Sequence, residues 1–219
     1  MKFTHLLSMA SIILLMGCTA ITPVEKQYSG FLGDYSDMEK AETPDGSDVM
    51  RWVSPSVQKG KYKKVIVPAV TFFPAPRTSD QVKLETLHKI SLYMSEQLKK
   101  ELSKNFEVTD VPGPDTLHVQ IAITGVATPM KGLKVYEAVP LVLVYAGATA
   151  AMGARDNVVV VYAEGLMTDS VTGQTVAKGV RQGVGESLRN DKQELDVEKV
   201  KTLLNGWAAE VGMLAKRLL

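Results

Sequence analysis

The feature that most constrains the fold is a pair of alternating, β-branched stretches on either side of a short polar turn. The two stretches cover residues 157–168 and 174–184, and the turn between them reads Asp-Ser-Val-Thr-Gly. Aspartate and serine side chains start turns by bonding to nearby backbone amides, and Gly173 can adopt the positive φ that the turn needs. We therefore expect a β-hairpin, whose first strand places every second residue on one face: Val158, Val160, Tyr162, Glu164 and Leu166.

Three further strands and two long helices are expected around this hairpin. Residues 62–73, 106–111 and 116–128 are rich in β-branched and aromatic side chains. Pro68 cannot donate to a strand ladder, so it places its strand at an edge or marks a bulge. Residues 78–103 and 191–219 repeat apolar side chains at intervals of three and four, which is typical of amphipathic helices. Together these elements predict an α+β domain in which an antiparallel sheet of four to five strands carries two long helices on one face.

The amino terminus predicts export. A basic start is followed by an apolar run at residues 6–16, which has the length of a signal-peptide core and is too short to span a bilayer. The run ends in Leu-Met-Gly-Cys, which resembles a bacterial lipobox and identifies Cys18 as the thiol that takes up a diacylglycerol. The alternative is that Cys18 is simply a small residue inside an anchor segment. We expect residues 1–17 to be a cleaved lipoprotein signal peptide. Because Thr19 rather than Asp follows Cys18, the resemblance to bacterial lipoproteins implies sorting to the outer membrane, with the domain facing the periplasm.

The rest of the chain divides into a lead-in segment and a domain. Residues 18–54 are expected to form the lipidated N-terminus, a tether and an irregular segment, and residues 55–219 a single α+β domain. The aromatic and leucine side chains near Tyr35 either clamp the irregular segment onto the domain or belong to a binding loop.

One uncharged stretch, residues 139–153, is shorter than the roughly twenty residues that span a bilayer. It is either a buried helix or connector, or an element that faces a membrane or a partner. Small side chains allow close approach of another backbone, and an apolar seam runs along the last helix. The candidate partner-binding residues are therefore Gly147, Ala148, Ala151, Gly153 and Trp207.

Composition and motifs offer little for catalysis. The 25 basic and 24 acidic side chains balance, which argues against a nucleic-acid partner. His88 and His118 lack companions at metal-ligand spacing, and no nucleophile elbow, phosphate loop or dinucleotide motif occurs. Glu164 with Lys178 or Arg181 fits a cross-strand ion pair better than a catalytic set. We expect no enzymatic activity, no metal and no cofactor.

Three short motifs carry a family resemblance. Ser-Gly-Phe-Leu with Asp-Tyr at residues 29–35, Arg-Trp-Val with Pro at 51–55, and the strand leading to Pro68 resemble the bacterial lipoprotein family catalogued as domain of unknown function 3313. Where that family often has Asp before the strand proline, this chain has Val67. The resemblance implies an envelope location and brings no established activity.

Two functions from different classes follow. The first is a non-catalytic envelope lipoprotein, held at the membrane by its N-terminal lipid, that binds an envelope protein or a second copy of itself, or scaffolds an assembly. The second is a periplasmic carrier or sensor of a small apolar ligand or lipid. A cavity lined by residues such as Leu98, Ile121 and Trp207 would favour the second function, and a filled core there would count against it.

Overall fold

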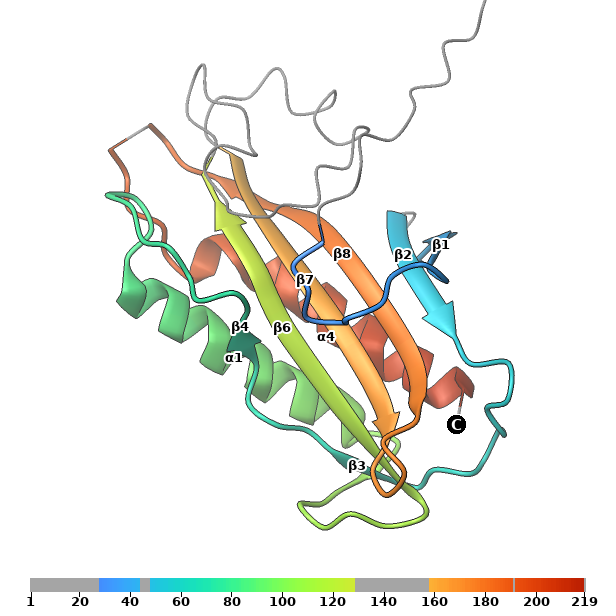
Figure 1. Ribbon diagram of the computed structural model, residues 1–219. Coiled ribbons are helices and arrows are strands. Elements are labelled where there is room, and N and C mark those ends of the chain that lie inside the picture. Colours follow the sequence, from blue (N-terminus) through green and yellow to red (C-terminus); the bar gives the residue numbers. More distant parts are fainter. Residues whose placement is uncertain (1–27, 44–47, 129–157, 191, 219) are drawn as a thin grey trace, which may run out of the picture.

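The computed structural model describes residues 28–43, 48–128, 158–190 and 192–218. These residues form an eight-stranded sheet with helices α1 (Leu84–Leu102) and α4 (Glu198–Leu218) behind one of its faces (Figure 1). The strands are β1 (Glu39–Glu42), β2 (Asp48–Val53), β3 (Lys64–Ile66), β4 (Thr71–Phe72), β5 (Glu107–Val108), β6 (Thr116–Ala127), β7 (Val158–Asp169) and β8 (Thr175–Ser187).

The sheet is mixed, and the prediction of four to five antiparallel strands is wrong. Its order is β1-β2-β8-β7-β6-β3-β5, with β4 also beside β6. Strand β3 runs parallel to both β5 and β6, and β4 runs parallel to β6. The reason is that α1 separates β3 and β4 from β6 along the chain, and a strand–helix–strand crossover returns the chain in the same direction.

The predicted hairpin is confirmed. Strands β7 and β8 pair antiparallel, and the Asp169 carboxylate accepts the backbone N–H groups of Val171 at 3.1 Å and Thr172 at 3.0 Å. Gly173 has a φ of 69°, which a side chain would disfavour. The same carboxylate accepts the Lys61 ammonium at 2.7 Å and the Tyr62 hydroxyl at 3.0 Å, which ties the turn to the start of β3.

Element boundaries differ from expectation in several places, and helix α4 begins at Glu198 rather than near residue 191. Residues 39–53, which we expected to be irregular, contain β1 and β2. The strand expected at residues 62–73 is divided into β3 and β4, with Pro68 between them. Helix α1 begins at Leu84 rather than near residue 78, and Gln81 instead uses its side-chain amide to donate to the Asn190 and Gln193 carbonyls.

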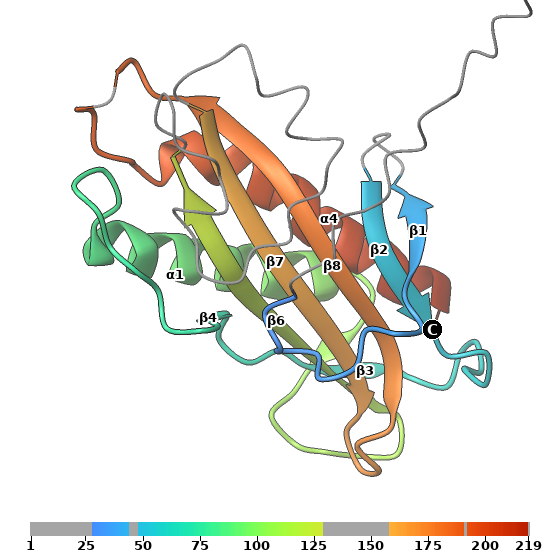
Figure 2. The same cartoon turned by 45° about the horizontal axis from the view of Figure 1, so that its top comes forward.

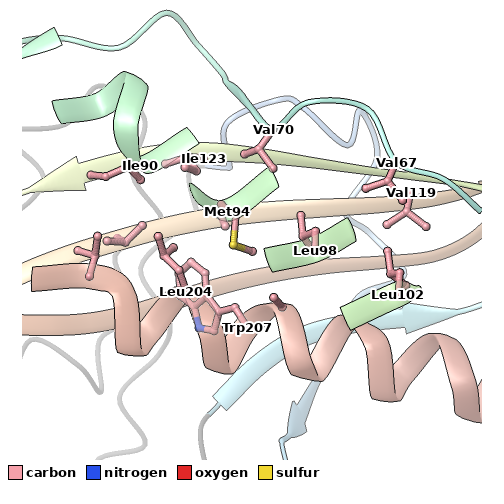
Figure 3. Packing of buried hydrophobic residues seen from close by; sticks show 14 of the residues in the cluster. Val67, Val70, Ile90, Met94, Leu98, Leu102, Val119, Ile123, Leu204 and Trp207 are labelled. Atoms are coloured by element: carbon pink, nitrogen blue, oxygen red, sulfur yellow. The ribbon is translucent and has the colours of Figure 1, made fainter. Parts of the chain in front are cut away.

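The main core lies between the sheet and the two helices (Figures 2 and 3). Both helices place an apolar stripe against the same face of the sheet, and Figure 3 shows the labelled side chains filling the space between them. The largest fully buried side chains of α1 follow three/four spacing: Leu87, Ile90, Met94, Leu98 and Leu102.

A second cluster lies on the opposite face, where residues 28–38 cross the sheet in front of β6, β7 and β8 (Figures 1 and 2). We call these residues the N-terminal clamp. Glu164, which is 2% exposed, accepts the backbone N–H of Ser29 at 3.0 Å and the hydroxyl of Tyr35 at 2.6 Å. Lys178 pairs with Asp37 at 2.6 Å and donates to the Asp34 carbonyl at 2.8 Å. The irregular segment is thus fixed to the domain by two buried charges.

Candidate functional site

Helix α4 approaches β8 very closely at one end of the sheet. A methyl group placed on Gly183 would lie 2.4 Å from Leu203 Cδ1, and one on Gly185 would lie 2.5 Å from the carbonyl oxygen of Lys199. Neither distance is sterically allowed, so glycine at these two positions is what lets the first turns of α4 lie against the strand. Further along β8 the same test at Gly179 meets only the backbone oxygen of Met50, at 3.9 Å. The space between helix and strand therefore widens from Gly185 towards Gly179.

A cavity of about 510 Å³ occupies the widened space. Apart from Met167 and Arg181, the helix-facing positions of β7 and β8 on its sheet side carry only small residues. These positions are Ala163, Gly165, Ala177 and Gly179. A volume of this size falls within the roughly 300–1,000 Å³ that small-molecule sites occupy.

Apolar side chains from three elements complete the walls. Met94 comes from α1, Ile121 from β6 and Trp207 from α4, and Figure 3 labels Met94 and Trp207 within one cluster of buried side chains. The remaining large apolar side chains of the lining are Val49, Leu166, Met167, Val211, Met213 and Leu214. Three of the lining residues are methionines, whose flexible thioether side chains adapt to ligands of irregular shape.

A largely buried ion pair crosses the cavity wall. Arg181 of β8 and Glu210 of α4 are joined by a salt bridge, with their side chains 11% and 15% exposed. The Arg181 guanidinium also lies 5.5 Å from the centre of the Trp207 ring. The pair joins α4 to β8 where the two backbones separate, and each charge offsets part of the cost of burying the other.

Trp207 places a hydrogen-bond donor at this wall. The side chain is 4% exposed, and its buried indole N–H has no acceptor within the part of the chain that the structure describes. Buried donors are nearly always satisfied in folded proteins, so this group marks a place where an additional acceptor would stabilise the protein.

The residues predicted from sequence are distributed differently. Cys18, Gly147, Ala148, Ala151 and Gly153 lie outside the described residues. Trp207 is described, and it lies in the domain interior. Of the three residues named for a ligand cavity, Ile121 and Trp207 line it, and Leu98 is packed in the neighbouring core at 1% exposure. The core is therefore hollow at Ile121 and Trp207.

The predicted pairing of Glu164 with Lys178 or Arg181 gives way to other contacts. Glu164 and Lys178 bind the N-terminal clamp on one face, while Arg181 pairs with Glu210 on the other. The two-residue period of a strand sends Arg181 to the face opposite Lys178, and on the clamp face Glu164 and Lys178 each bind groups of the clamp.

The histidines do not contribute to the cavity. His88 is exposed on α1, and His118 is partly buried on β6, where burial lowers its pKa. Within residues 28–43, 48–128, 158–190 and 192–218, no group of three or more metal-binding side chains comes together. No helix among those residues is both long and apolar enough to cross a membrane.

Sequence reasoning missed the small residues of the sheet and the arginines near them. A usable signal was present, because Ala163, Gly165, Ala177 and Gly179 recur at every second position of two adjacent strands. Small side chains in that pattern leave a shallow surface on one face of a sheet. The pattern by itself does not tell whether a helix fills that surface, and this is why only the structure reveals the cavity.

The fold and the cavity define an α+β domain with an apolar pocket between its sheet and one helix. The chain belongs to the family described as "Protein of unknown function (DUF3313)", which it matches over residues 27–211, so the resemblance seen in the sequence is confirmed. It is also 34% identical over 212 residues to the "Uncharacterized lipoprotein YdcL" of Escherichia coli K12, a match that covers 97% of this chain and 96% of the relative. The family description assigns no function.

Solved structures show only distant similarity. A lipoprotein GNA1162 from Neisseria meningitidis is 15% identical and aligns over 70% of this chain and 98% of its own, with a TM-score of 0.37. A PelC dodecamer from Paraburkholderia phytofirmans is 12% identical and aligns over 74% of this chain and 95% of its own, with a TM-score of 0.34.

Proposed function

We propose that this chain is a lipid-anchored, non-catalytic protein of the bacterial envelope whose domain binds a small apolar ligand. The observation that carries the proposal is the cavity of about 510 Å³ between α4 and the small residues of β7 and β8. Water inside such a space finds few polar partners, because methionine, tryptophan and aliphatic side chains form most of its walls. An apolar ligand would replace that water and gain roughly 25 cal/mol for each Å² of apolar surface buried.

The anchor part of the proposal rests on Cys18 and on the relative. The lipobox-like residues precede Cys18, and the E. coli protein at 34% identity is itself named a lipoprotein. Acylation at Cys18 and location at the periplasmic side of the outer membrane are expected together. In the native host, wild type should incorporate labelled palmitate and fractionate with the outer membrane, while Cys18→Ala should do neither. An outer-membrane Cys18→Ala protein together with an unlabelled wild type would refute the anchor.

The ligand-binding part is tested by filling the cavity. Gly179→Leu places a side chain into open space from the sheet side, and leucine is compatible with a strand. Gly206→Ala is the matched control, because Gly206 is exposed on α4 and a methyl group there meets no atom within 4 Å. The probe is N-phenylnaphthylamine, an uncharged dye whose fluorescence rises in an apolar site.

Wild type and Gly206→Ala should show saturable dye binding at one site, and Gly179→Leu should lose it. Near-ultraviolet circular dichroism must show that the leucine variant keeps its tertiary packing. The absence of saturable binding in wild type, or full binding in a folded Gly179→Leu variant, would refute the ligand-binding role.

The partner-binding or scaffolding role remains a separate prediction. It rests on the uncharged residues 139–153, and crosslinking in the native envelope with a Gly147→Leu variant tests it. The interior position of Trp207 favours a ligand within the domain as the use of that residue.

A further inference from the structure

Most charged residues of the cavity lining already bind a partner. Arg181 and Glu210 neutralise each other across the wall. Glu164 and Lys178 are bound by the clamp on the opposite face of the sheet. This leaves Glu42, an exposed residue of the edge strand β1, as the remaining acid of the lining.

Two arginines of the lining remain available. Arg51 is half-buried on β2, and Arg217 is exposed in the last turn of α4. Across the residues that the structure describes, neither guanidinium takes part in a salt bridge. Part of the Arg217 charge offsets the partial negative charge at the carboxyl end of α4, so Arg51 is the stronger site for an anion. A planar guanidinium also suits carboxylate and phosphate groups, which it binds through two parallel N–H donors.

The apolar part of the cavity limits the size of a ligand that these arginines would bind. The lining includes the apolar side chains of Met94, Met167 and Trp207, together with the guanidinium groups of Arg51 on β2 and Arg217 in the last turn of α4. About 510 Å³ lined mainly by apolar atoms suits one hydrocarbon chain rather than the paired chains of a whole phospholipid.

Resting on the ligand-binding function, we propose that the ligand is a single-chain amphiphile with an anionic head. The hydrocarbon chain lies between α4 and the small residues of β7 and β8, and the carboxylate or phosphate head lies at Arg51, with Arg217 beside it.

The test uses contact quenching of one tryptophan. The sequence has two tryptophans, so Trp52→Phe leaves Trp207, at the cavity wall, as the sole reporter. Cys18→Ala in the same full chain removes the expected acylation site, so that binding is measured without detergent. Dibromostearic acid and dibromostearyl alcohol carry the same quenching bromines and differ in the head, which is an anionic carboxylate in the acid and an uncharged hydroxyl in the alcohol.

The acid should quench Trp207 with a dissociation constant about fivefold lower than that of the alcohol, which is the ratio that a partly exposed ion pair supports. Arg51→Met should abolish this preference and leave the affinity for the alcohol unchanged. Arg189→Met, which removes an exposed arginine of the β8–α4 connection, should keep the preference. Displacement by dodecanoate or by dodecyl phosphate then shows whether the head is a carboxylate or a phosphate.

Equal affinity of wild type for acid and alcohol would overturn this inference and leave the ligand-binding function standing. Survival of the preference for the acid in both Arg51→Met and the Arg51→Met/Arg217→Met double variant would likewise overturn this inference and leave the ligand-binding function standing. If neither dodecanoate nor dodecyl phosphate displaces the bromoacid, the anionic single-chain ligand is also wrong. Failure of both brominated probes to quench Trp207 would instead refute the ligand-binding function itself.

Discussion

Removing one hydroxyl group from the N-terminal clamp should destabilise the domain measurably. The Tyr35 hydroxyl donates to Glu164 at 2.6 Å and accepts the backbone N–H groups of Gly30 at 3.0 Å and Leu32 at 3.1 Å. Burial, followed by the hydrogen bond to the Glu164 carboxylate, raises the pKa of Tyr35, so the hydroxyl keeps its proton at neutral pH. Tyr35→Phe keeps the ring, which stacks on Tyr28 at a centroid distance of 4.0 Å, and deletes only the hydroxyl.

The expected loss in free energy of unfolding depends on which groups lose a hydrogen-bond partner. Glu164 is 2% exposed, so water cannot readily replace the missing donor. A hydrogen bond to a charged group contributes about 1.5–3 kcal/mol, and the partly exposed backbone amides contribute less because water reaches them. We expect Tyr35→Phe to lower the free energy of unfolding by about 2 kcal/mol. For a domain of this size that corresponds to a decrease in Tm of roughly 4–8 °C.

Tyr93→Phe is the matched control for this variant. Its hydroxyl donates to Asn205 Oδ1 at 2.8 Å in an exposed, uncharged bond, so the same chemical change should cost about 0.5 kcal/mol or less. Urea unfolding followed by tryptophan fluorescence measures both. A double-mutant cycle of Tyr35→Phe with Glu164→Gln should give a coupling energy of at least about 1 kcal/mol. Equal losses in the two tyrosine variants, or additivity in the cycle, would refute the assignment of Glu164 as the anchor of the clamp.

Two further changes test the turn and the helix contact. The hydrogen bond from the Lys61 ammonium, opposed by burial and assisted by backbone amides, holds the pKa of Asp169 well below its usual value. The ionised carboxylate therefore stabilises the fold above the unfolded-state pKa of about 3.9, and this contribution is lost as pH falls below that value. The difference in urea midpoint between wild type and Asp169→Asn should accordingly shrink from pH 7 to pH 3. A constant difference would contradict this. Gly183→Ala should lower the free energy of unfolding by about 1–3 kcal/mol, because the added methyl group clashes with Leu203. Gly206→Ala should raise it by up to about 1 kcal/mol, because alanine favours the helix. Thermal unfolding measures both variants, and an unchanged stability of Gly183→Ala would show that α4 moves without strain.

Much of the fold could be predicted because its signals are local. The β7–β8 hairpin carries its own turn chemistry, and β6 places Leu117, Val119 and Ile123 on a single face, so both were located to within a few residues. The direction of β3 was missed because the strand is only three residues long, and its partners are chosen by the crossover through α1. Short strands carry too little alternation to reveal how they pair.

Strands β1 and β2 escaped prediction for different reasons. Strand β1 is a mostly exposed edge strand with charged residues at three of its four positions, so no apolar pattern marks it. Strand β2 is partly covered on both faces, with Met50 and Trp52 against the clamp cluster and Arg51 on the cavity side. Covering both faces removes the contrast between alternate residues from which a half-buried strand is recognised.

The same two-residue period separates the contacts of the N-terminal clamp from the cavity lining within this domain. Along β8, Lys178 faces the clamp and its neighbour Gly179 faces the cavity, so adjacent residues of one strand serve opposite surfaces. The first described residue, Tyr28, lies on the clamp side of the sheet. The ligand that we propose between α4 and the sheet would contact the other face, so Tyr35→Phe should leave the affinity of Trp207-quenching probes unchanged at temperatures where the domain stays folded. A weakened affinity in that variant would mean that the two faces are energetically coupled through the shared strands.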